Sequence, residues 1–109
     1  MLSGGDEEGR VLVFAIDPEG VETRVVHELV DFRGQRVLEI GAGDGRLTWR
    51  YAELAASVLA IEPKELLVEQ ARAATPPELK GSVTFEVGDA TTFDLPSGAF
   101  DVALFSRSL

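Results

Sequence analysis

Cysteine is absent from this chain of 109 residues, and histidine, tryptophan and tyrosine each occur once. Without cysteine the chain forms no disulfide and offers no thiolate to a metal ion, which fits a reducing compartment. No apolar run approaches the ~20 residues that cross a membrane. The first nine residues, MLSGGDEEG, lack the basic and apolar parts of a secretory signal peptide. These absences predict a cytoplasmic protein.

Basic residues are also scarce, because 10 Lys and Arg stand against 19 Asp and Glu, for a formal net charge of −9. Since contacts with phosphates require a basic patch, this balance argues against tight binding of nucleic acid by this segment. No grouping of His or carboxylate side chains has metal-ligand spacing, and no nucleophile–base pair is visible. We therefore predict no metal site and assign no catalytic residue.

The most informative stretch is RVLEIGAGDGRLT, residues 36–48. Its apolar start is typical of a strand buried on both faces. Gly41, Gly43 and Gly45 then permit positive φ angles and let a ligand touch the main chain. Glu39 adds a carboxylate acceptor just before this turn. The segment would suit a ligand that carries both amino and carboxylate groups.

Strand and helix patterns alternate along the chain. Besides the glycine segment, strands are predicted over 10–16, 58–61, 81–87 and 100–105; helices are predicted over 21–30, through Leu47, Tyr51 and Leu54, and over 64–74. Residues 1–9 are predicted to form a flexible terminus. Strand 10–16 either forms a hairpin with the segment after it or leads into the first helix. The alternation predicts a parallel α/β sheet with right-handed crossovers, whose ligands bind at the carboxyl ends of the strands.

Residues 36–109, about two thirds of the chain, resemble the amino-terminal half of a class I S-adenosylmethionine-dependent methyltransferase. The run from Glu39 to Gly45 is similar to that family's acidic-x-Gly-x-Gly-x-Gly signature, and acidic residues follow the next two strands at Glu62 and Asp89. The resemblance implies a Rossmann-like, doubly wound sheet in three αβα layers, incomplete here, with about four core strands. Residues 10–109 would be a partial S-adenosylmethionine-binding domain.

The resemblance also implies which residues contact the cofactor. A carboxylate suits the two ribose hydroxyls, because it accepts hydrogen bonds from both. The implied contacts are Glu39, Gly41, Ala42 and Gly43 for the methionine end, Glu62 for the ribose, with its direction set by Pro63, Asp89 and Ala90 for the adenine, and Ser106 beside the reactive methyl. The methyl acceptor, whether a small molecule, a protein or an RNA, is not specified.

Two alternatives remain open. A nicotinamide-dependent oxidoreductase fragment is the weaker one, because the G-x-G-x-x-G fingerprint would place its last glycine where Arg46 stands. The other follows from length, since the family's domain continues beyond the fourth strand while this sequence ends at Leu109. The chain would then be a fragment, half of a split enzyme or a short non-catalytic module. Strand 100–105 would be an open edge through which it self-associates or pairs with a missing half.

Overall fold

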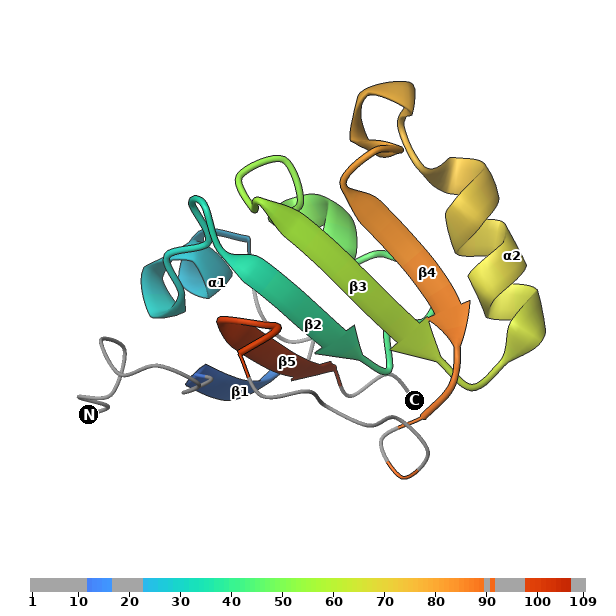
Figure 1. Cartoon of the computed structure of the whole chain (residues 1–109), viewed down its shortest axis with the longest axis horizontal. Helices are drawn as coiled ribbons and strands as arrows, with labels where there is room; N and C mark the ends of the chain where they lie inside the picture. Colours follow the sequence, from blue (N-terminus) through green and yellow to red (C-terminus); the bar gives the residue numbers. More distant parts are fainter. Residues whose placement is uncertain (1–11, 17–22, 90, 92–97, 107–109) are drawn as a thin grey trace.

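The computed structural model describes residues 12–16, 23–89, 91 and 98–106, and these form a five-stranded sheet (Figure 1). The strands are β1 (Leu12–Ile16), β2 (Arg36–Ile40), β3 (Ser57–Glu62), β4 (Val83–Val87) and β5 (Val102–Ser106), in the spatial order β1-β5-β2-β3-β4. Every neighbouring pair is parallel. The parallel α/β class is thus confirmed, and all five strands lie within or close to the ranges predicted from the sequence, β1 being the strand predicted over 10–16. The terminus 1–9 lies outside the described residues.

The position of β5 overturns the prediction of an open edge at 100–105. Figure 1 shows β5 between β1 and β2, and its residues pair with both strands. Of the two alternatives for 10–16, the hairpin is wrong, because β1 pairs with β5 in parallel, Leu12 opposite Val102. A strand close to the start of the chain therefore covers one that is almost at its end. Within the described residues, the sheet edges are β1 and β4.

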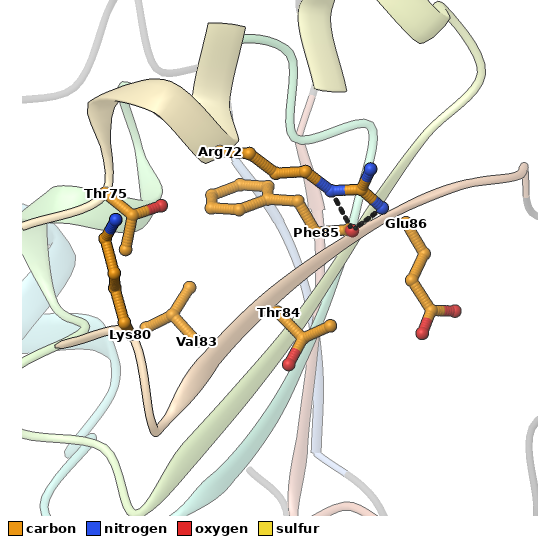
Figure 2. A pocket seen from close by; sticks show the side chains of 7 residues that line it. All are labelled: Arg72, Thr75, Lys80, Val83, Thr84, Phe85 and Glu86. Carbon is orange, nitrogen blue, oxygen red and sulfur yellow. Dashed lines mark hydrogen bonds between the residues drawn. The ribbon is translucent and has the colours of Figure 1, made fainter. Parts of the chain in front are cut away.

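The edge at β4 is partly capped by a side chain. Ser82 and Gly88 bond to β3, so the odd-numbered residues of β4 turn their main-chain groups outward. The Arg72 guanidinium donates to the Phe85 carbonyl oxygen from Nε at 3.1 Å and from Nη2 at 2.7 Å, beside an open pocket of about 350 Å³ (Figure 2). This contact occupies the central acceptor that an added strand would need.

The main hydrophobic cluster lies on one face of the sheet, and Leu38, Ile61 and Ala103 are buried on the other. Val37, Val58, Val83 and Val102 form a register row across four strands, and all are buried. Helices α1 (Thr23–Leu29) and α2 (Glu65–Ala74) match the helices predicted over 21–30 and 64–74. In α2, Val68 and Ala71 are buried against this face, because residues three apart share one side of a helix. Among the described helices, none is long and apolar enough to cross a membrane.

The helix predicted after the glycine turn is wrong. The chain there forms only the 3₁₀ helix η2 (Thr48–Arg50), followed by turns. Leu47 and Tyr51 are buried as their spacing suggested, but Leu54 is 40% exposed. Tyr51 leaves the helical region, with φ −134°, and stacks on Phe32 at a ring-centroid distance of 4.4 Å. The predicted burial of Leu47 and Tyr51 is thus confirmed. The predicted helix does not form, because Tyr51 leaves helical geometry to stack on Phe32. A second 3₁₀ helix, η3 (Pro77–Leu79), follows α2.

Candidate functional site

The glycine turn is built on positive φ angles and held against the end of β3. Gly41, Gly43 and Gly45 have φ values of 82°, 63° and 97°, a region that other residues enter only with strain. The Gly41 and Ala42 N–H groups both donate to the carbonyl oxygen of Ile61, at 2.9 and 3.0 Å. The turn therefore cannot move independently of β3, and these two N–H groups are already bonded within the chain.

Glu62 joins the carboxyl ends of three strands. Its Oε1 accepts a hydrogen bond from the Gly43 N–H at 2.8 Å, and its Oε2 accepts one from the Lys64 N–H, at the start of α2, at 3.0 Å. Its main-chain oxygen accepts from Gly88, just after β4, at 3.1 Å. The residue is buried. A carboxylate oxygen can accept more than one hydrogen bond, so these contacts leave Glu62 able to accept from a ligand hydroxyl.

Glu39 is fully buried on β2, on the same face of the sheet as Glu62. Its Oε1 accepts hydrogen bonds from the Thr48 and Tyr51 hydroxyls, each at 2.7 Å. Its Oε2 is buried and has no hydrogen-bond partner among the described residues. Burial raises the pKa of Glu39 from 4.5 to about 7, although the two hydroxyl bonds act to lower it. A buried carboxylate with one unpartnered oxygen needs an explanation.

The remaining predicted contacts are placed only in part. Asp89 follows Gly88, so it lies beside the Glu62 main chain, and its Oδ1 accepts from the Thr91 N–H and hydroxyl in a local turn. Pro63 follows Glu62 and is exposed. Ser106 is the last residue of β5, but its side chain is outside the description, as is all of Ala90.

Sequence reasoning missed Thr48 and Tyr51 as partners of Glu39. It placed Tyr51 on the apolar face of a helix, whereas its hydroxyl reaches back across the glycine turn to β2. One signal was present in the sequence: Glu39 interrupts an apolar strand, and a buried carboxylate must find hydrogen-bond donors. The sequence does not say which donors these are, because they depend on how the turn folds.

Two other polar residues have structural roles. His27 donates from Nε2 to the Arg50 carbonyl oxygen at 2.6 Å and packs its ring edge against Phe32. Asp101, at the amino end of β5, accepts from the Arg36 main chain and guanidinium. In the parts of the chain that are described, no cluster of His or carboxylate residues forms a metal site.

Comparison with known proteins bears on this arrangement. A family model described as a methyltransferase domain matches residues 37–109, well over half of the chain. The chain belongs to the methyltransferase domain family. This finding confirms the resemblance to class I S-adenosylmethionine-dependent methyltransferases that the glycine segment indicated.

Relatives and solved structures agree with that family. The chain is 38% identical over 79 residues to a magnesium-protoporphyrin O-methyltransferase of Rhodobacter capsulatus, covering 72% of this chain and 34% of that protein. A crystal structure of an S-adenosylmethionine-dependent methyltransferase from Mesorhizobium loti matches with a TM-score of 0.68 and 28% identity, over 84% of this chain and 42% of that one.

A methyltransferase from Thiobacillus denitrificans, solved in complex with S-adenosyl-L-homocysteine, matches with a TM-score of 0.62 and 28% identity, over 76% of this chain and 34% of that one. These matches support a Rossmann-like methyltransferase fold. The chain spans about a third of the length of the curated relatives it matches.

Proposed function

We propose that residues 10–109 form the cofactor-binding part of an S-adenosylmethionine-dependent methyltransferase. The observation that supports this most is the meeting of three strand ends at one point, where Glu62 bonds to Gly43 and to Gly88. Ligands of parallel α/β sheets bind at this end of the strands. The solved relative from Thiobacillus denitrificans, which holds S-adenosyl-L-homocysteine, supports the choice of cofactor.

The residues at this point fit the chemistry of the cofactor. S-adenosylmethionine carries an ammonium group and a sulfonium, both positive, and the unpartnered Oε2 of Glu39 is a buried acceptor of the kind an ammonium requires. We assign Glu39, Gly41, Ala42 and Gly43 to the methionine end and Glu62 with Pro63 to the ribose. We further assign Asp89 and Ala90 to the adenine and Ser106 to the vicinity of the methyl group.

For methyl transfer, the main task of the protein is to position the cofactor and the methyl acceptor. Methyl transfer is an in-line displacement at a methyl group carried by the cofactor, so it depends mostly on proximity and alignment. Residues that shape an acceptor pocket are not identified within the described chain, and the acceptor remains open among small molecules, proteins and RNA. The direct test of the proposal is therefore cofactor binding.

Isothermal titration of the purified chain with S-adenosyl-L-homocysteine tests the proposal. We expect saturable binding at one site, and no binding of NADH under the same conditions. A folded sample that gives no heat with S-adenosyl-L-homocysteine would contradict the proposed function. Binding of NADH instead would favour the oxidoreductase alternative.

The variant Glu62→Ala tests the assigned ribose contact. Loss of a charge-assisted hydrogen bond should weaken S-adenosyl-L-homocysteine binding by roughly 1–3 kcal/mol. Glu69→Ala is the matched control, because Glu69 is exposed on α2 and its loss changes the net charge equally. Equal affinities for the two variants, with both folded by circular dichroism, would rule out Glu62 as a contact.

A further inference from the structure

The carboxyl of Glu39 connects the two sides of the glycine turn. Glu39 precedes the turn on β2, whereas Thr48 and Tyr51 follow it, and both hydroxyls donate to the same oxygen at 2.7 Å. All three side chains are buried. The pair of hydrogen bonds therefore sets the distance between the start and the end of the turn, and it leaves only Oε2 without a partner among the described residues.

No positively charged side chain of the described residues pairs with the carboxyl of Glu39. On β3 and β5 its register neighbours are Ala60 and Leu104, which are uncharged, and none of the ion pairs among the described residues includes Glu39. Glu62, two residues beyond Ala60, points the same way but bonds to main-chain N–H groups.

Near Tyr51, the other titratable ring among the described residues is that of His27 on α1. Phe32 stacks on Tyr51 and also contacts His27, whose Nε2 donates to the carbonyl oxygen of Arg50. Burial and the charge of Glu39 raise the pKa of Tyr51 well above its usual value, so Tyr51 remains a donor at neutral pH. Within the described chain, hydroxyls alone thus donate to the carboxyl of Glu39.

We propose that Thr48 and Tyr51 are positioning residues of the cofactor site, which hold one oxygen of Glu39 so that the other faces the ammonium group of the cofactor. This inference rests on the proposed function. The two hydroxyls do not contact the cofactor themselves; they act through Glu39. Because a protonated Glu39 attracts an ammonium less than an ionised one, cofactor affinity should fall as the pH drops through the pKa of Glu39.

Removing either hydroxyl should shift this pH dependence in a definite direction. Both hydrogen bonds lower the pKa of Glu39 against the effect of burial. Thr48→Val and Tyr51→Phe keep the approximate shape of each side chain but remove the donor, so Glu39 should titrate at higher pH, by roughly one unit. At pH 7 the ionised fraction, and the affinity for S-adenosyl-L-homocysteine with it, should then fall about fivefold.

The experiment follows the ¹³C resonance of the Glu39 carboxyl between pH 5 and 9 without ligand, and measures S-adenosyl-L-homocysteine affinity by calorimetry over the same range. Wild type, Thr48→Val and Tyr51→Phe are compared with Thr84→Val, a control that removes an exposed hydroxyl from β4. We expect both midpoints to rise in the two test variants and to stay in place in the control.

Several outcomes would overturn the inference. If the variants lose stability but both midpoints stay where they are in wild type, the hydroxyls have a structural role only. If Glu39 titrates while the affinity of wild type is the same at every pH, Glu39 does not face the ammonium.

If no protein binds S-adenosyl-L-homocysteine, the proposed function fails, and the carboxyl titration still decides whether the hydroxyls control the pKa of Glu39. Should Tyr51→Phe not fold, Thr48→Val carries the test.

Discussion

The two ends of the sheet treat acidic side chains in opposite ways. At the amino end, Asp101 is partly exposed and paired with Arg36, which donates from its main chain at 2.9 Å and from its guanidinium at 2.9 and 3.1 Å. At the carboxyl end, Glu39 and Glu62 are buried, and their donors are hydroxyls and main-chain N–H groups. Among the described residues, neither glutamate has an ion-pair partner.

This difference separates a structural contact from a candidate binding site. The guanidinium of Arg36 holds the pKa of Asp101 below its usual value. Both side chains are therefore charged, and each neutralises the other without a ligand. A buried carboxylate without a cation costs stability, and Glu39 shows the cost as a pKa raised by burial. Perturbed groups of this kind concentrate at functional sites. The carboxyl end is therefore suited to a cationic ligand, and the amino end is not.

The largest expected effect comes from removing the charge of Glu39. Its pKa is raised from 4.5 to about 7 in the folded chain, so the native state binds more protons than the unfolded state between these values. Stability should therefore fall as the pH rises through this window, by about 3 kcal/mol in total. In Glu39→Gln this loss should be absent.

Urea unfolding of wild type and Glu39→Gln at pH 4, 5, 6, 7 and 8 measures this difference. The exposed residue Glu53 supplies the control, Glu53→Gln, which should follow wild type. Because the pKa values of Asp31 and Asp101 are lowered, their contribution to stability is lost only as the pH falls through the usual aspartate value of 3.8 and below it. Parallel pH profiles for wild type and Glu39→Gln would show that Glu39 does not carry a raised pKa.

The next largest loss of stability is expected from replacing a glycine at either end of the sheet with alanine. Gly34, before β2, has φ 72° and open space where a Cβ would lie, whereas a Cβ on Gly45 would lie 2.9 Å from the Trp49 ring. Gly34→Ala should cost about 1 kcal/mol from backbone strain, and Gly45→Ala about 2 kcal/mol or more because the indole must also move.

Thermal unfolding measures both variants, and the fluorescence of Trp49, the single tryptophan, reports the second. We expect an altered emission spectrum in Gly45→Ala and an unchanged one in Gly34→Ala. If the two variants lose equal stability and share the wild-type spectrum, the close packing of Trp49 on the turn is refuted.

The smallest effect is expected from Asp101→Asn, because its partner Arg36 is exposed and solvent screens the pair. The amide still accepts a hydrogen bond from the Arg36 main chain, so stability should fall slightly, and the difference from wild type should shrink as salt is added. Chemical unfolding at low and high NaCl checks this. A loss as large as that expected for Gly45→Ala, and unaffected by salt, would mean that the two ends of the sheet do not differ as described.

Local patterns in the sequence accounted for most of the strands and both α-helices. Alternation of apolar residues indicated 81–87, and the repeat of three and four indicated 64–74, because such patterns reflect which side chains one element can bury. The three glycines indicated the turn for an equally local reason, since positive φ is a property of single residues. The end of β3 at Glu62 was predicted because a proline follows it, while the role of Glu62 as a cofactor contact stays a prediction.

Contacts between distant residues were decided only by the tertiary structure. The pairing of β1 with β5 joins segments near opposite ends of the sequence, and no local pattern encodes a partner so far away. The two donors to Glu39 depend on the path of the turn, and stacking of Tyr51 on Phe32 replaced the expected helix with η2. The sequence by itself therefore determined the strands, both α-helices and the position of the glycine turn. The packed structure determined what each buried polar group bonds to, because that depends on all the elements at once.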